Sequence, residues 1–66
     1  MAKLEERRRF ILETARRLGR PIWVGDVALN AMDQEFYRGV FRSLVEEGKL
    51  VRRPGAKGSR AYYYFN

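Results

Sequence analysis

The closing third of the chain constrains its fold more than any other segment. An apolar-periodic run over residues 33–48 ends at Gly48, and two short stretches with strand character, 49–53 and 60–65, flank a turn-rich tip at 54–59. Glycine after the last apolar position is a typical helix stop, and the Pro-Gly and Gly-Ser pairs in the tip favour a reversal of the chain. The sequence therefore predicts a helix followed by an antiparallel hairpin that pairs residues 49–53 with 60–65.

The same segment is strongly basic. Residues 49–66 carry five basic side chains and no acidic one, in a chain of 66 residues with a net charge of +6. The basic residues are Lys49, Arg52, Arg53, Lys57 and Arg60. A basic cluster on a hairpin is the electrostatic footprint typical of nucleic-acid binding. Ordinary solubilising charge is the alternative interpretation.

Size and residue types exclude several kinds of site. Residues 1–66 suffice for one domain with one small core, and the absence of cysteine excludes disulfides and thiolate zinc ligands. The absence of histidine removes the commonest general base and metal ligand. Ser43 and Ser59 have no evident activating partner. We therefore expect no catalytic site, no metal, no cofactor and no small-molecule substrate.

The first element predicted is an amphipathic helix over about residues 3–18. Its apolar stripe consists of Leu4, Ile11, Ala15 and Leu18, with Phe10 and Thr14 beside it. Its other face carries Glu–Arg pairs four residues apart, each typically stabilising a helix by about 0.2–0.5 kcal/mol. These pairs are Glu5–Arg9, Arg9–Glu13 and Glu13–Arg17, and local acidic partners of this kind are also expected for Arg7 and Arg8. Gly19 and Pro21 end the helix.

Two short elements are predicted before the helix that precedes the hairpin. Residues 21–24 favour a strand, and residues 25–31 are long enough for a two-turn helix. Asp33 is the expected N-cap of the next helix. The buried face of that helix is expected to contain Tyr37, Val40, Phe41 and Leu44. Gly39 lies inside it at a cost of about 1 kcal/mol relative to alanine, which indicates either close helix packing or close approach of another backbone or DNA.

The last strand is rich in aromatic residues. Strand alternation places Tyr62 and Tyr64 on one face of the hairpin, and Ala61, Tyr63 and Phe65 on the other. One of these sets is expected to cover the helices, because such an aromatic stripe more often forms core than a ligand platform.

The predicted order is helix, strand, helix, helix, strand, strand. With this order, the segment from Val40 to Arg53 resembles a winged helix-turn-helix domain, and residues 11–24 resemble the first helix and strand of that family. The most telling pattern is a helix ending in Leu-x-x-x-Gly-x-Leu-Val, formed by Leu44, Gly48, Leu50 and Val51 and followed by a basic tip. The fold class implied is α+β, a three-helix bundle with a small antiparallel hairpin wing.

The resemblance implies binding to double-stranded DNA, with the third helix in the major groove and the wing on the backbone or minor groove. The helix positions that match base or phosphate contacts are Gln34, Glu35, Arg38 and Arg42. The wing and its flanks contribute Arg52, Arg53, Lys57 and Arg60. Arginine suits guanine and glutamine suits adenine in such contacts.

Three functions follow from these patterns. The first is a small transcription regulator that binds duplex DNA. One such module buries only about 600–1,000 Å² of protein surface on DNA, so a homodimer is the natural way to reach useful affinity. The second is a protein-interaction adaptor, which the acidic start of the third helix favours. The third is RNA binding through Tyr62, Tyr63 or Tyr64. No apolar stretch has the length of a membrane span or signal segment, which predicts a cytoplasmic protein, nucleoid-associated if prokaryotic.

Overall fold

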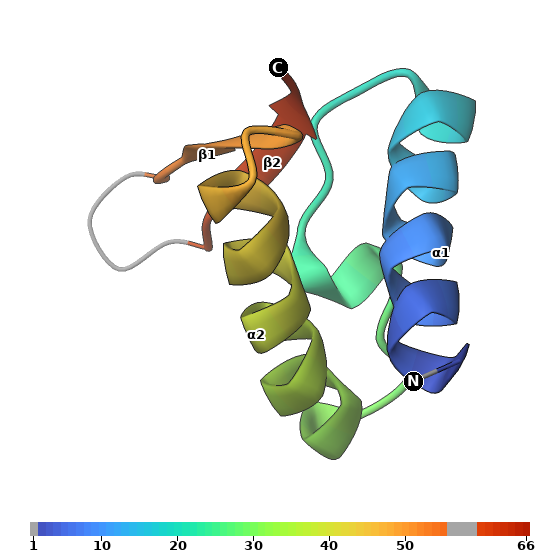
Figure 1. Cartoon of the computed structure of the whole chain (residues 1–66). Coiled ribbons are helices and arrows are strands. Elements are labelled where there is room, and N and C mark those ends of the chain that lie inside the picture. Colours follow the sequence, from blue (N-terminus) through green and yellow to red (C-terminus); the bar gives the residue numbers. More distant parts are fainter. Residues whose placement is uncertain (1, 56–59) are drawn as a thin grey trace.

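The computed structural model describes residues 2–55 and 60–66, and the predicted contact residue Lys57 lies outside these described residues. The elements in chain order are α1 (Ala2–Leu18), the 3-10 helix η1 (Val24–Asp26), α2 (Ala31–Glu46), β1 (Leu50–Arg53) and β2 (Tyr62–Phe65). In Figure 1, α1 and α2 stand side by side, and the hairpin lies at the carboxyl end of α2. The chain is thus a small α+β fold with an antiparallel hairpin, as predicted.

Helix α1 forms as predicted but buries only part of its apolar stripe. Ile11, Thr14 and Ala15 are at most 4 % exposed, whereas Leu4 and Phe10 are each 43 % exposed. Gly19 adopts a φ of 63° and donates its amide to the Ala15 carbonyl, which closes the helix. Within residues 5–17, none of the three predicted Glu–Arg pairs four apart is within ion-pair distance. That prediction was wrong, and Glu5 instead lies 3.6 Å from Arg8, three residues later.

The predicted two-turn helix over 25–31 is replaced by η1 and an irregular connection, so the described residues hold two α-helices instead of three. Asp26 accepts a hydrogen bond from the Trp23 amide at 3.0 Å, which tightens this segment into a 3-10 turn. A Cβ on Gly25 would lie 2.2 Å from the Trp23 ring, so any other residue there would displace this ring. The predicted strand over 21–24 is also reduced, to one bridge in which Ile22 and Tyr63 exchange backbone hydrogen bonds of 2.8 and 2.7 Å.

Helix α2 begins earlier than predicted. Its N-cap is Asn30, whose Oδ1 accepts from the Asp33 amide at 2.9 Å, and Asp33 in return accepts from the Leu29 amide at 3.2 Å. This reciprocal arrangement satisfies two amides that the helix start would otherwise leave without partners. Asp33 is therefore the third residue of the helix and not its cap. As a consequence Met32, which the sequence placed in a connection, belongs to α2.

The end of α2 is the glycine stop that the sequence predicts. Gly48 has a φ of 79°, its amide donates to the Val45 carbonyl, and the Lys49 amide donates to the Leu44 carbonyl. These two bonds form a Schellman motif, which reverses the chain into β1. The predicted buried face of α2 is confirmed, because Tyr37, Val40, Phe41 and Leu44 are all at most 4 % exposed.

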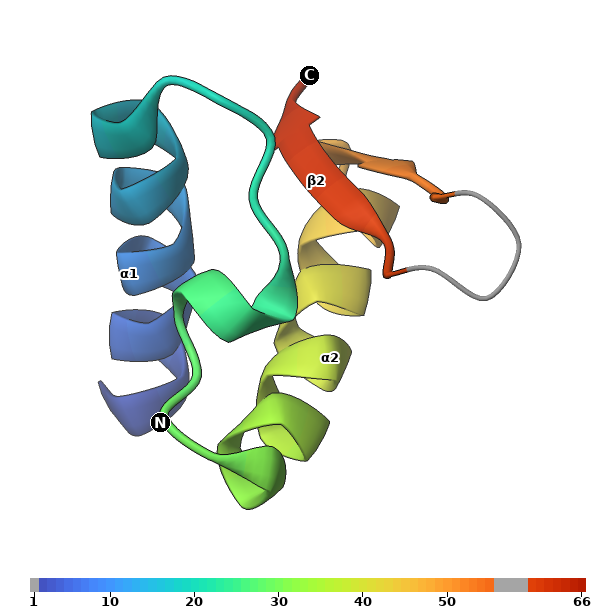
Figure 2. The ribbon, with the colours of Figure 1, turned by 180° about the vertical axis from the view of Figure 1, so that it is seen from behind.

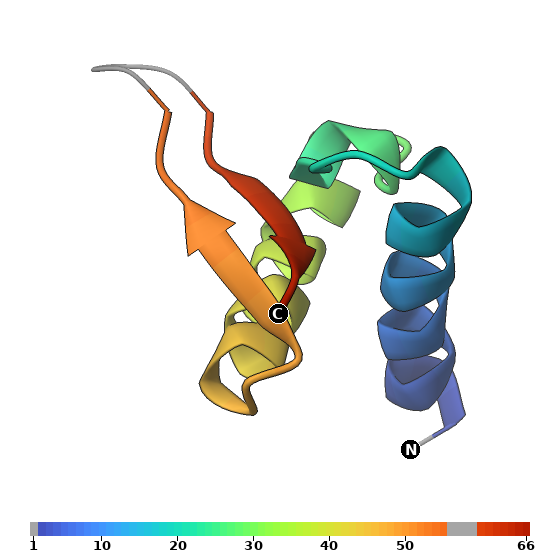
Figure 3. The ribbon, with the colours of Figure 1, turned by 90° about the horizontal axis from the view of Figure 1, so that it is seen from above.

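The hairpin closes the core against both helices. Its register pairs Leu50 with Phe65 and Arg53 with Tyr62. Both strands are therefore shorter than the predicted 49–53 and 60–65. The Tyr63 ring stacks on Phe41 with centroids 4.3 Å apart, which confirms that one aromatic face of β2 covers the helices. Figure 2 shows β2 between β1 and the segment that leads from α1 to η1, and Figure 3 shows the hairpin crossing above α2. No helix within residues 2–55 and 60–66 is long and apolar enough to cross a membrane.

Candidate nucleic-acid interface

A groove of about 440 Å³ lies between α2 and the hairpin. Its floor is apolar, because Phe41 and Val45 of α2 meet Tyr63 of β2 there. Its charged rim is mostly basic: Arg38 and Arg42 come from successive turns of α2, and Arg52 comes from β1. The fold therefore brings together three of the predicted contact residues from two elements that are separate in the sequence.

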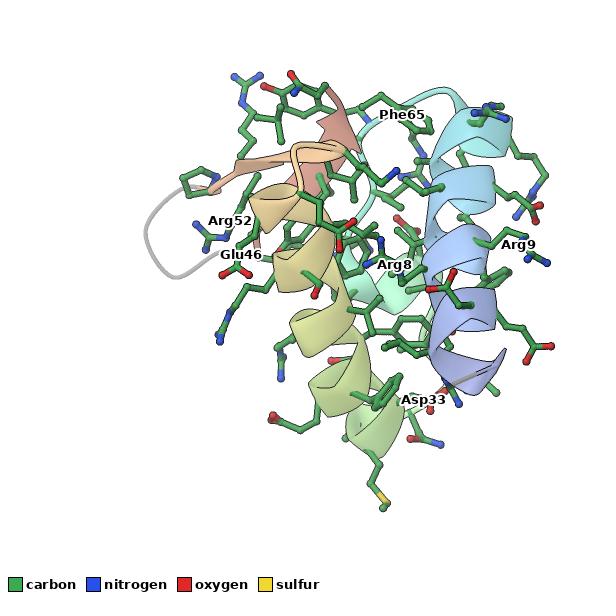
Figure 4. The ribbon with its side chains drawn as sticks, viewed as in Figure 1. Arg8, Arg9, Asp33, Glu46, Arg52 and Phe65 are labelled. Atoms are coloured by element: carbon green, nitrogen blue, oxygen red, sulfur yellow. The ribbon has the colours of Figure 1, made fainter. Side chains whose placement is uncertain are left out.

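The groove arginines have few acidic neighbours. Arg38 lies 3.5 Å from Glu35, but the two side chains are 59 % and 73 % exposed, so this pair contributes at most about 1 kcal/mol. Within the described residues neither Arg42 nor Arg52 forms an ion pair. Glu46 is the one acidic residue of the rim, and Figure 4 shows its carboxylate on the same side as Arg52. The guanidinium groups of this groove are thus open to an anionic ligand.

Asp33, near the start of α2, and Glu47, just after its end, lie away from the groove and pair with α1. Asp33 is 3.8 Å from Arg7 of α1, and the Arg7 guanidinium lies over the Phe36 ring at 4.8 Å. Arg8 makes a bidentate contact with Glu47. These contacts form a seam between α1 and α2, defined by Arg7, Arg8, Asp33 and Glu47. Its carboxylates are therefore compensated within the protein and do not face a ligand in the groove.

The seam also changes the acid–base properties of its members. The hydrogen bond to Glu47 raises the pKa of Arg8 further above its ordinary value, although partial burial opposes this. The same hydrogen bond from Arg8 holds the pKa of Glu47 below its usual range, together with the charges of Arg8 and Lys49. Both shifts favour the ionised pair at neutral pH.

The Arg60 guanidinium lies over the Trp23 ring, 3.6 Å from its centroid. This cation–π contact positions a cation just before β2, beside the η1 turn. Burial alone would raise the pKa of the nearby Asp26, but hydrogen bonds from Arg20 and the Trp23 amide outweigh it and hold that pKa below its ordinary value, with a smaller contribution from the Arg60 charge. Trp23 is a residue that the sequence-based site lacks.

The remaining predicted contact residues are dispersed. Arg53 lines a different cavity on another side of the hairpin, although it directly follows Arg52. Gln34 is half-buried, and Glu35 is exposed next to Arg38. Strand alternation already contained the signal that separates Arg52 from Arg53, since adjacent strand residues point to opposite faces.

Gly39 lies on the exposed side of α2 with open space around it. A Cβ built there would meet nothing within 4 Å, so the packing explanation for this glycine is wrong. Near it, at the start of the helix, Met32 and the preceding Leu29 are 85 % and 90 % exposed. The sequence-based site lacks both, because the N-cap of α2 was predicted three residues too late, at Asp33, and Leu29 was assigned to the helix expected over 25–31. The outer face of α2 thus presents the apolar Met32, the Glu35–Arg38 pair, a position without a side chain at Gly39, and Arg42.

Exposure of the tyrosines bears on the RNA alternative. The Tyr63 ring already stacks on Phe41, and Tyr62 is half-buried. Tyr64 is 38 % exposed and lies away from the groove, where it lines the same cavity as Arg53. The three tyrosines therefore do not form a continuous stacking platform.

Comparisons of the chain with protein-family models, with curated proteins and with solved structures gave no significant match. The geometry of the groove and its charges are therefore the basis for assigning a function.

Proposed function

We propose that the chain is a winged-helix protein that binds double-stranded DNA, with α2 in the major groove and the hairpin as the wing. The observation that carries this proposal is the convergence of Arg38, Arg42 and Arg52 around the groove between α2 and β1. The order of elements supports it as well: η1 stands where the family has its second helix, and Ile22 bridges β2 where the family has its first strand. On this assignment the protein regulates transcription and acts in the cytoplasm, on the nucleoid if it is prokaryotic.

The dimensions of α2 suit this role. Its 16 residues span about 24 Å, and the major groove of B-DNA, about 12 Å wide, admits one α-helix. Gly39 leaves the middle of the outer face of α2 without bulk, and Glu35 is exposed on it beside Arg38. Arg38 and Arg42 then lie within reach of base edges or phosphates, and Arg52 and Arg60 within reach of the flanking backbone.

A second copy of the chain would supply the area that one module lacks. Single modules bury about 600–1,000 Å² of protein surface on DNA, which limits the affinity of a monomer. Two copies on a repeated site would double the number of phosphate contacts, and the proposal includes such a homodimer on DNA. No step in this function requires catalysis, a metal or a cofactor.

The test is fluorescence anisotropy with a labelled random duplex of about 25 base pairs, titrated at several salt concentrations. We expect affinity to fall steeply with salt, and Arg42→Ala to reduce the magnitude of the salt slope by about one. The matched control is Arg9→Ala, which removes the same charge from the side of α1 that points away from α2 (Figure 4). Absence of binding at low salt, or equal losses in the two variants, would contradict the proposal.

A further inference from the structure

A second cavity lies on another side of the hairpin and shares no lining residue with the groove. Its volume is about 680 Å³, within the range of about 300–1,000 Å³ that is typical of ligand sites. It lies between the carboxyl end of α1 and the two strands, and Figure 4 shows Phe65 at this junction. Its main lining residues are Arg16, Arg20, Pro21, Arg53, Tyr64 and Phe65. We call it the α1–β2 pocket.

Every charged residue that lines the α1–β2 pocket is an arginine. Arg20 already has an acidic partner, because its guanidinium donates to both carboxylate oxygens of Asp26 at 3.2 and 3.3 Å. Arg16 and Arg53 have no ion pair within the part of the chain that the structure describes. The pocket therefore offers two arginines to a ligand, one on α1 and one on β1.

The pocket also exposes aromatic surface that the core does not use. Tyr64 and Phe65 are 38 % and 40 % exposed, although Leu50, the strand partner of Phe65, is only 2 % exposed. The Arg16 guanidinium lies over the Phe65 ring, 5.6 Å from its centroid, so one face of this ring is already covered by a cation. An apolar ligand group beside Tyr64 and Phe65 would remove this surface from water, which is favourable.

We infer that the α1–β2 pocket binds an acidic segment of a protein partner. One aromatic or large aliphatic side chain of the segment packs on Tyr64 and Phe65, and its carboxylates pair with Arg16 and Arg53. Charge complementarity supports this occupant, because guanidinium and carboxylate groups form bidentate hydrogen bonds. A DNA duplex would satisfy the arginines but would present only phosphates and sugars, leaving the aromatic surface without an apolar partner. Single-stranded nucleic acid would need ring faces open to successive bases, whereas Tyr64 and Phe65 are each less than half exposed.

This pocket gives the protein a second binding surface beside the groove. Arg52 and Arg53 are adjacent in β1, yet Arg52 lines the groove and Arg53 lines the α1–β2 pocket. A partner docked through Arg53 would therefore leave the arginines of the groove uncovered. The inference stands without the proposed DNA binding, since the peptide is measured in the absence of DNA.

The experiment titrates the full chain into a labelled peptide of about 12 residues that alternates Asp and Glu around one central Trp. A control peptide replaces the Trp by Ser. We expect Arg53→Ala to weaken binding of the Trp peptide about tenfold, as is typical for loss of a charge-assisted hydrogen bond. Arg52→Ala, the matched change in the neighbouring residue, should leave affinity within about twofold because it lines only the groove. The Ser peptide should bind more weakly than the Trp peptide to the unchanged protein.

Each other outcome would overturn the inference. No saturable binding at about 1 mM peptide would remove the site. Equal losses in Arg52→Ala and Arg53→Ala would indicate general attraction between a basic protein and any polyanion. Tighter binding of a single-stranded oligonucleotide with the same loss in Arg53→Ala would replace the peptide by nucleic acid. Self-association that Arg53→Ala abolishes, measured by sedimentation, would identify the occupant as a second copy of this chain.

Discussion

The two sides of α2 use the same residue type for different purposes. On the side of α1, Arg7 and Arg8 meet Asp33 and Glu47, and the seam carries no net charge. On the side of the hairpin, Arg42 and Arg52 have no such partners within the described residues. Arginine is therefore structural in the seam and available in the groove. A count of basic residues alone does not reveal this difference, because only the acids brought near by the fold distinguish the two sides.

The largest expected effect comes from removing the core that both sides share. Leu44 is fully buried between them, so Leu44→Ala should lower the free energy of unfolding by about 2–5 kcal/mol. Leu29 is 90 % exposed and provides a matched control, since Leu29→Ala should change stability by less than about 0.5 kcal/mol. Urea denaturation of both variants measures the difference. Similar losses in the two would mean that the buried face of α2 is assigned incorrectly.

The next prediction separates the groove from the seam by their effects on DNA. If Arg38 contacts a base, Arg38→Ala should narrow the gap in binding free energy between a specific and a random duplex by about 1–3 kcal/mol. Arg7→Ala, which removes an arginine from the seam, should leave this gap unchanged. Competition titrations with the two duplexes provide the measurement, once a preferred site has been selected. A uniform loss for Arg38→Ala across sequences would reassign Arg38 to the DNA backbone.

The sequence predicted best those features that depend on neighbouring residues. Gly48 ends α2 as expected because its own positive φ and two local hydrogen bonds suffice for the stop. The buried face of α2 follows from spacing alone. The early start of α2 also had a local signal, Asn30 followed three residues later by Asp33, but Asp33 resembled a cap strongly enough to mask it.

The features that the sequence did not predict depend on side-chain contacts that apolar spacing does not reveal. Asp26 turns the chain at Trp23 while its carboxylate is held by Arg20, and this competes with the helix expected over 25–31. Arg8 makes a bidentate contact with Glu47, 39 residues away, which helix periodicity does not predict. Of the predicted contact residues, three converge on the groove, and their convergence required the hairpin to fold back along α2.

A smaller effect is expected at Gly39, where stability and binding should change in opposite directions. Open space surrounds this position, so Gly39→Ala should raise the free energy of unfolding by about 1 kcal/mol. If DNA approaches the backbone there, the same change should weaken DNA binding. Gly48→Ala is the control, since its φ of 79° makes alanine destabilising. If Gly39→Ala leaves DNA affinity unchanged, DNA does not approach the backbone closely at Gly39.

The smallest expected effect tests the charge balance of the seam. Because Arg8 lowers the pKa of Glu47, this pair contributes stability that is present above the pKa of the unfolded carboxyl group and is lost as pH falls through the lower folded value. The difference in unfolding free energy between the parent chain and Glu47→Gln should therefore shrink as pH is lowered from about 7 to about 3. Glu13→Gln, on an exposed position of α1, is the control and should show a smaller difference at neutral pH. A gap that persists at about pH 3 would mean that Glu47 acts by packing and not by charge. Neutralisation of Arg8 by Glu47 would then contribute no stability, and ion pairing would no longer distinguish the seam from the groove.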